Sequence, residues 1–349
     1  MSETVEREHS SIPWLWELLL YPLLFALALA LRAFQLGLFA TWGELAWTHR
    51  AARFWQALGE RSVDPVTLID PSGTVVLWAS SLGLALRRLV VAPGSALSWQ
   101  ELPHLTAYDP QNLAQLRLLA SFWPAATLPV AAANSLLVLL IAALVARLWG
   151  ARAGLFAGLL VAVSPYHLAL SRVLGPQALT AGLAVSSLLA LLWAVRGPRS
   201  WAPFLLAGAL GGLAVLNQGL AAVLVPYELL FLLAGHAIGC RSPWLWLRNL
   251  GLWAAGLLAA CFLAYPGTWA APSVAAQTLL GQASEAWRLF GGPGGAREAA
   301  LALGLRLSPL ALVGLGLALL RLPLDENRHR LPSLGLLAFA LAFLFLAPP

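Results

Sequence analysis

The sequence predicts an all-α, polytopic membrane protein with about nine membrane-spanning helices. Of the 349 residues, 60% are hydrophobic and only 10% are charged, whereas soluble globular chains carry about 25% charged residues. The apolar residues gather in stretches that reach the length of about 20 residues needed to cross a bilayer. Arginines concentrate in every second loop between these stretches, which is the bias that orients membrane helices.

The predicted spans begin with Pro13–Leu31, which we interpret as a retained helix because no small-x-small cleavage site follows it. The other eight are a helix within Leu118–Ala146, then Ala153–Leu168, Ala178–Val195, Trp201–Leu216, Leu220–Ala234, Leu250–Tyr265, Leu301–Leu320 and Leu331–Ala347. The chain therefore divides into a cytoplasmic N-terminus, residues 1–12, and a single transmembrane domain, residues 13–349.

The positions of the arginines predict that the N-terminus is cytoplasmic. The inside loops are then Arg147–Arg152, Arg196–Ser200, His236–Asn249 and Arg321–Arg330, which hold two, two, two and three arginines. The short outside loops, Ala169–Gln177 and Asn217–Gly219, hold one and none. The absence of lysine, with abundant Ala, Leu and Arg, indicates a GC-rich prokaryotic genome. We therefore expect a multi-pass protein of a bacterial plasma membrane.

Two outside segments are long, residues 32–117 and residues 266–300. Within the first, Thr41–Leu58 and Gly73–Val91 are predicted amphipathic helices that lie along the outer membrane surface. Gly73–Val91 could instead form a tenth span. A tenth span would invert everything after it and place the arginine-rich loops outside, so we favour the surface position.

Composition also excludes some classes of function. The net charge of +6 would suggest a nucleic-acid partner in a soluble protein. Here arginines at helix ends account for it, and no nucleic acid is predicted. Cys240 and Cys261 form neither a disulfide framework nor a zinc pattern. No internal repeat is visible, which argues against an inverted-repeat transporter.

Several short motifs occur in a fixed order along most of the chain. They are Leu31–Gly37 followed by Thr41–Glu44, Asp70-Pro71 before an apolar stretch, Arg147–Gly150, Ser164–Tyr166 followed by Ser171–Leu174, Leu206–Leu216, and Pro266, Trp269 and Pro272 before Arg306–Leu310. This ordered set resembles the GT-C superfamily of membrane glycosyltransferases. The likeness is closest to the protein O-mannosyltransferase and lipid A aminoarabinose transferase branch, which uses polyprenyl-phosphate sugars.

The resemblance implies an enzyme that transfers a hexose or related sugar from a polyprenyl phosphate to an acceptor at the outer membrane face. Its implied partners are the polyprenyl-phosphate sugar and the lipid bilayer, and the acceptor is unknown. Such a transfer needs a base for the acceptor and positive charge for the leaving phosphate. A divalent metal could supply that charge, but most of the oxygen ligands it would need are missing, so no metal ligand or cofactor is predicted.

The sequence departs from the family pattern at several charged residues. The family's Asp-Glu reads Gly43-Glu44, an expected Asp is Gln177, and an expected Lys is Asn217, which we interpret as part of a simple turn. These departures favour an alternative, a catalytically degenerate relative that binds a lipid-linked sugar or a partner protein. A transporter or flippase is a third hypothesis, in which Glu228 would matter and Glu44 would not.

Five residues are candidates for the site. Glu44, expected at the outer surface, is either a general base or acceptor anchor, or a solvated interface carboxylate. Asp70 is either an auxiliary catalytic carboxylate or a turn-forming residue beside a proline. Arg172 and Arg50 are either donor-phosphate contacts or interface and headgroup anchors. Glu228 lies within a predicted span, where a carboxylate is costly and needs a partner that the sequence does not name.

Overall fold

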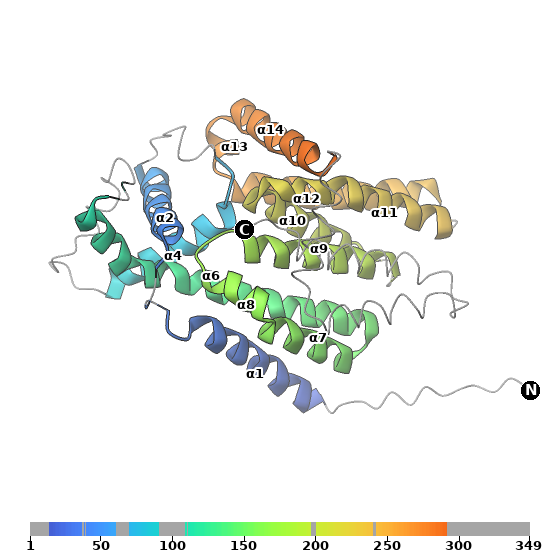
Figure 1. Cartoon of the computed structure of the whole chain (residues 1–349). Helices are drawn as coiled ribbons and strands as arrows, with labels where there is room; N and C mark the ends of the chain where they lie inside the picture. Colours follow the sequence, from blue (N-terminus) through green and yellow to red (C-terminus); the bar gives the residue numbers. More distant parts are fainter. Residues whose placement is uncertain are drawn as a thin grey trace, which may run out of the picture.

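The structure is a computed structural model that describes residues 14–36, 38, 40–60, 70–90, 109, 111–196, 200–239 and 242–291. These residues form helices and no strand, so the predicted all-α class is confirmed for them (Figure 1). The helices are α1 (Trp14–Ala33), α2 (Trp42–Glu60), α4 (Thr74–Val90), α6 (Leu113–Trp149), α7 (Ala151–Val163), α8 (Pro165–Arg172), α9 (Gln177–Arg196), α10 (Ala202–Asn217), the 3₁₀ helix η1 (Gly219–Val223), α11 (Leu224–Gly239), α12 (Pro243–Ala264), α13 (Gly267–Ala270) and α14 (Pro272–Gly291).

The predicted spans coincide with helices wherever the structure describes them. Three of these helices, α6, α9 and α12, are long and apolar enough to cross a membrane, and the bent pair α7–α8 would make a fourth. Leu19–Ala33, Ala202–Asn217 and Gly219–Leu233 are apolar but shorter. The predicted N-terminus, residues 1–12, and the last two predicted spans lie outside the described residues. The chain is thus a polytopic helical membrane protein, and the count of nine spans stays a prediction.

The predicted span Ala153–Leu168 is covered by two helices, α7 and α8, and not by one. The chain breaks at Ser164, and the axes of α7 and α8 differ by 59°. Pro165, at the start of α8, explains the break, because proline lacks the N–H of a helical hydrogen bond and its ring clashes with the preceding turn.

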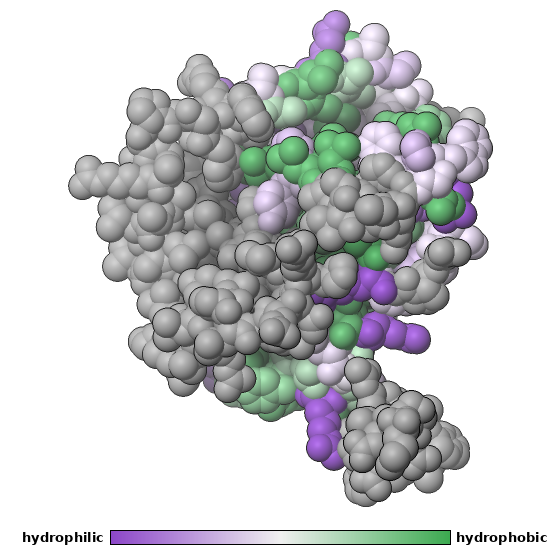
Figure 2. All heavy atoms as spheres, turned by 90° about the vertical axis from the view of Figure 1, so that its right-hand side faces the viewer, coloured by the Kyte–Doolittle hydropathy of each residue, from purple (hydrophilic) through white to green (hydrophobic). Residues whose placement is uncertain are grey.

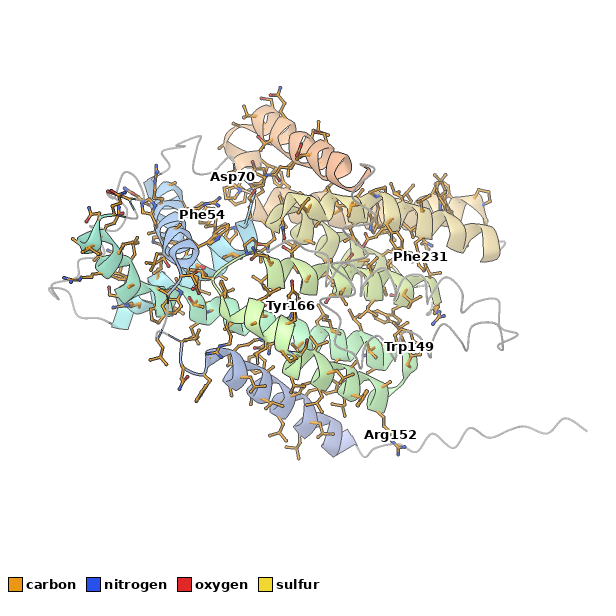
Figure 3. All side chains as sticks on the ribbon, viewed as in Figure 1. Phe54, Asp70, Trp149, Arg152, Tyr166 and Phe231 are labelled. Atoms are coloured by element: carbon orange, nitrogen blue, oxygen red, sulfur yellow. The ribbon has the colours of Figure 1, made fainter. Side chains whose placement is uncertain are left out.

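The long helices lie side by side and their connections gather at two ends (Figure 1). The arginine end comprises the ends of α6, α9 and α11 and the starts of α7, α10 and α12 (Figure 1). The loop end comprises α2, the start of α4, the α8–α9 and α10–η1 connections, and Tyr265. Asp70 and Phe54 lie towards the loop end, and Trp149 and Arg152 at the arginine end (Figure 3). This grouping agrees with the predicted alternation of loops. Figure 2, which looks onto the arginine end, shows strongly hydrophilic side chains there.

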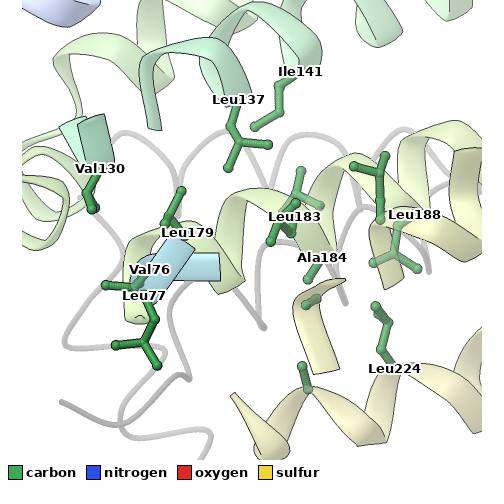
Figure 4. Close-up of a cluster of buried hydrophobic side chains, with 14 of the residues drawn as sticks. Val76, Leu77, Val130, Leu137, Ile141, Leu179, Leu183, Ala184, Leu188 and Leu224 are labelled. Carbon is green, nitrogen blue, oxygen red and sulfur yellow. The ribbon is translucent and has the colours of Figure 1, made fainter. Parts of the chain in front are cut away.

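The apolar core is centred on α9. This helix is apolar on all sides, as expected of a helix buried within a bundle. Of its most apolar stretch of 18 residues, 89% is buried inside the protein. Figure 4 shows Leu183 and Leu188 of α9 in one cluster with Leu137 and Ile141 of α6 and with Leu224 of α11. The bundle therefore buries its apolar side chains around α9.

Helices α10 and α12 approach each other closely through glycines. A Cβ atom at Gly208 would lie 1.9 Å from the carbonyl oxygen of Trp253. A Cβ atom at Gly256 would lie 2.2 Å from the carbonyl oxygen of Leu205. In lipid, small residues at a helix contact permit the close packing that stabilises the pair.

The two predicted amphipathic stretches of the first outside segment are the helices α2 and α4. One face of α4 is buried against α2 and α6, and the other carries exposed leucines. Gly83 of α4 lies against the carbonyl oxygen of Ala125 in α6. That carbonyl loses its usual helical donor because Pro129, four residues later, has no N–H. α4 is not among the candidate spans, in line with the preferred surface position.

The second long outside segment, residues 266–300, is described as far as Gly291, and this part is helical. It contains α13 and α14, and α14 packs against η1. Gln282 of α14 meets the backbone of Gly219. This helix therefore covers part of the loop end.

Substituting Gly256 with alanine is expected to destabilise the bundle by about 1–3 kcal/mol, because the added methyl group meets the backbone of α10. Gly251→Ala is the control on the same helix, since nothing lies within 4 Å of its Cβ position. Thermal unfolding in detergent would measure both. Equal melting temperatures for the two variants would contradict the close α10–α12 contact.

Candidate functional site

Glu44 forms a capping box at the start of α2. Its Oε2 atom accepts a hydrogen bond of 2.8 Å from the backbone N–H of Thr41. In return, the Thr41 hydroxyl oxygen accepts one of 3.4 Å from the backbone N–H of Glu44. This reciprocal pairing satisfies N–H groups that a helix start leaves free, and it fixes the direction in which α2 leaves α1.

The second carboxylate oxygen of Glu44 joins α2 to two other parts of the bundle. Oε1 accepts hydrogen bonds from the Trp123 indole N–H of α6, at 3.2 Å, and from the backbone N–H of Leu174, at 3.0 Å. The side chain is only 2% exposed. The interpretation of Glu44 as a solvated interface carboxylate is therefore wrong, because local capping and the contact with α6 bury it in the protein.

The other carboxylate of the loop end, Asp70, forms an ion pair with Arg50. Arg50 Nη2 donates to Asp70 Oδ2 at 2.9 Å and to the backbone oxygen of Ser72 at 3.1 Å. Its guanidinium also stacks over the ring of Trp47, 4.4 Å from the centroid. The two charged side chains remain 36% and 48% exposed. Asp70 Oδ1 meanwhile accepts from the N–H of Ser72, so Asp70 is a turn former as well as a partner of Arg50.

The turn after Asp70 touches α14 and the end of α12. Gln282 of α14 donates to the Ser72 hydroxyl oxygen at 3.0 Å. Tyr265, the residue that follows α12, is buried, and it lies close enough to Asp70 for the two groups to interact electrostatically. Near this turn the side-chain carbonyl oxygens of Gln218 and Gln282 are buried and have no donor among the described residues. Such oxygens can accept a hydrogen bond from a hydroxyl group.

Asn217 holds this turn against the helix bundle. Its backbone oxygen accepts from the N–H of Gly73 at 2.8 Å, and its Oδ1 from the N–H of Val76 at 3.3 Å. Its amide nitrogen donates to the carbonyl oxygen of Pro176 at 2.8 Å and to the hydroxyl of Thr180 at 2.9 Å. Interpreting Asn217 as simple turn chemistry is therefore wrong, because this fully buried side chain connects α4, α9 and α10.

The two other positions that depart from the family pattern supply no carboxylate. Gly43 is exposed, and only the Thr41 hydroxyl oxygen lies within 4 Å of its Cβ position. Gln177, at the start of α9, is half-buried, and its amide group folds back over Gly175. Neither residue carries an ionisable group.

Arg172 connects the end of α8 to the end of α1. Its Nη2 donates to the carbonyl oxygen of Phe34 at 2.6 Å, and the bond is exposed. The structure does not bring Arg172 into a hydrogen bond with Glu44, Asp70 or Arg50 among the bonds of the described residues.

Arg32 and His167 form a buried pair that the sequence analysis did not single out as a site. Arg32 is fully buried and donates to the carbonyl oxygen of Ala28 at 2.9 Å. Its Nη2 lies 3.0 Å from His167 Nδ1. Because arginine only donates, Nδ1 accepts and the proton of this imidazole is on Nε2. The sequence offered two hints of this pair, an arginine at the end of the first predicted span and a histidine two residues after Pro165.

Glu228 is placed within the bundle, apart from the loop-end carboxylates. Its hydrogen-bond partners are Ser187 of α9 and Trp253 of α12. The structure thus names the partners that a carboxylate in a span requires. In the part of the chain that the structure describes, no three His, Cys, Asp or Glu side chains gather as metal ligands.

The chain was also compared with known protein families. The sequence model of a family described as dolichyl-phosphate-mannose-protein mannosyltransferase matches residues 116–266. Over these residues the chain is similar to that family. The predicted resemblance to GT-C membrane glycosyltransferases is therefore confirmed for this segment. Comparisons with curated proteins and with solved structures gave no match.

The matched segment runs from α6 to the end of α12 and is less than half of the chain. It contains Arg172, Gln177, Asn217 and Glu228. Glu44, Arg50 and Asp70 lie before it. Glu44 forms hydrogen bonds with Trp123 and Leu174 inside the matched segment, and the turn after Asp70 forms one with Asn217. The chain is thus a glycosyltransferase-like membrane protein whose first outside segment packs against the matched helices.

Replacing Glu44 with glutamine is expected to lower stability by about 1–3 kcal/mol, because one amide oxygen cannot replace two carboxylate oxygens and the amide N–H₂ would face N–H donors. Asp70→Asn should cost no more than about 1 kcal/mol, as for an exposed ion pair. Thermal unfolding of the two purified variants would compare them. An Asp70→Asn variant less stable than Glu44→Gln would contradict the structural role given to Glu44.

Proposed function

We propose that the chain transfers a hexose or related sugar from a polyprenyl-phosphate donor to an acceptor, at the outer face of a bacterial plasma membrane. The observation that carries the proposal is the exposed Arg50–Asp70 pair at the loop end of helices that match the mannosyltransferase family. The description of that family names a dolichyl-phosphate sugar, and polyprenyl phosphates share that chemistry.

The reaction assigns complementary tasks to a carboxylate and a cation. An oxygen of the acceptor bonds to the anomeric carbon of the sugar, and the bond from that carbon to the donor phosphate breaks. Asp70 takes the proton of the acceptor hydroxyl as general base. Arg50, 2.9 Å away, stabilises the negative charge on the leaving phosphate, and Arg172 is a second candidate for this contact.

Glu44 acts in this scheme as a positioning residue. Its two oxygens already accept hydrogen bonds from Thr41, Trp123 and Leu174. An acceptor would have to displace one of these donors to use Glu44 as its base. Glu44 instead fixes the start of α2, the helix that carries Arg50.

The buried amide oxygens of Gln218 and Gln282 support a sugar as the ligand. Both lack a donor among the described residues, and Gln282 also donates to Ser72 in the turn that follows Asp70. A hexose presents several hydroxyl donors, so its binding would satisfy acceptors that are otherwise costly to bury.

A second candidate function is a catalytically degenerate relative that binds a lipid-linked sugar or a partner protein without transfer. The specific observation in its favour is that Glu44 is saturated by internal donors. Gly43 and Gln177 stand where the family has carboxylates. Among the described residues, Asp70 is then the one exposed carboxylate left at this site.

Sugar transfer from a labelled polyprenyl-phosphate hexose to a pool of acceptors, by purified protein in lipid, tests the proposal. Asp70→Asn is expected to reduce turnover by about 10²-fold or more, as for the loss of a general base. Asp109→Asn is the matched control: Asp109 is an exposed carboxylate of the same outside segment, and its bond to the N–H of Gln111 is one that asparagine can keep.

The other outcomes separate the hypotheses. Absence of turnover by the wild type, with the donor bound equally well by the wild type and Asp70→Asn, would support the degenerate relative. Turnover unchanged in Asp70→Asn would overturn the role of Asp70 while leaving the transferase intact. Donor movement across the bilayer that depends on Glu228 and not on Asp70 would support a flippase instead.

A further inference from the structure

Glu228 joins four helices at a point that the proposed reaction does not use. Its side chain is 1% exposed and lies on α11. Trp253 of α12 donates its indole N–H to Oε2 at 2.7 Å. Ser187 of α9 lies 2.5 Å from Oε1, and the same hydroxyl oxygen lies 2.7 Å from the carbonyl oxygen of Ala207 in α10.

The number of protons available to these contacts bears on whether the Glu228 carboxyl group is protonated or ionised. Ser187 Oγ makes two oxygen–oxygen contacts of hydrogen-bond length, to Glu228 and to Ala207. Each such contact needs a proton between the oxygens, since otherwise two electron-rich atoms would face each other. The serine hydroxyl supplies only one proton. A proton on Glu228 would supply the other.

Among the side chains that the structure describes, none around Glu228 offers a positive charge to an ionised carboxylate. Within the described residues, no arginine forms an ion pair with it. The ionisable side chains described on α9 to α12 are Arg196, Tyr227, Arg248 and Cys261, with none on α10. An unpaired carboxylate within a span is costly to bury.

We propose that Glu228 is a protonated carboxylic acid, which donates to Ser187 and accepts from Trp253 and so locks α9, α10, α11 and α12 together. In this series of hydrogen bonds, the Trp253 N–H donates to Oε2 of Glu228. Oε1–H of Glu228 then donates to Ser187 Oγ, and the Ser187 O–H donates to the carbonyl oxygen of Ala207. Gly211 of α10 allows the approach, because a Cβ there would lie 3.2 Å from Ser187 Oγ and 3.3 Å from Glu228 Oε2. The proton is structural and takes no part in sugar transfer.

Infrared spectroscopy of the full chain in lipid at neutral pH tests this directly. The spectrum of the wild type minus that of Glu228→Gln should show the carbonyl stretch of a protonated carboxylic acid. Glu285→Gln, which alters an exposed carboxylate of α14, should retain the band. In Trp253→Phe the band should move to higher frequency, because its carbonyl oxygen loses the indole donor. Absence of the band, or its persistence in Glu228→Gln, would overturn the proposal.

Stability provides an independent measurement. A glutamine amide donates from its nitrogen and accepts at its oxygen, so Glu228→Gln should melt close to the wild type. Glu228→Ala and Ser187→Ala should both melt lower, since each leaves buried groups of the chain without a partner. A Glu228→Gln protein that melts as low as Glu228→Ala, or does not fold, would show that the native side chain is ionised and overturn the proposal.

Discussion

The loop end depends on one buried amide. Asn217, the last residue of α10, forms hydrogen bonds with the start of α4 on one side and with the start of α9 on the other. In a membrane protein, backbone groups at helix ends must find partners inside the protein. Asn217 supplies both donors and acceptors for this purpose. The turn that follows Asp70 is thereby fixed against the helices that match the mannosyltransferase family.

The two loop-end carboxylates consequently have different characters. Glu44 is buried and fully used in holding α2 against α6 and Leu174. Asp70 is half-exposed and keeps a cation beside it. Burial and hydrogen bonding, rather than position in a motif, separate a residue that positions a site from one that can meet a substrate. A chain that lacks some of the family's carboxylates can therefore still have one available for chemistry.

The sequence predicted the helical class and the main helices, because apolar runs of span length are a strong local signal. The break before Pro165 could also be predicted from the local sequence, because a proline interrupts an apolar run there. Contacts such as Glu44 with Trp123, or Asn217 with Gly73, join residues far apart in the sequence. No periodicity or spacing encodes such pairs. For the same reason the partners of Glu228 and the pairing of Arg32 with His167 emerged only from the fold.

We propose that the lipid-linked sugar binds at the loop end, around Asp70 and the Asn217 turn. Hydrogen–deuterium exchange of the purified protein, with and without a polyprenyl-phosphate hexose, tests it most directly. Donor bound there should slow exchange in residues 70–77 and 217–223 and leave exchange around Arg147–Arg152, at the opposite end, unchanged. Protection confined to the arginine end, or equal protection by polyprenol without phosphate and sugar, would contradict it.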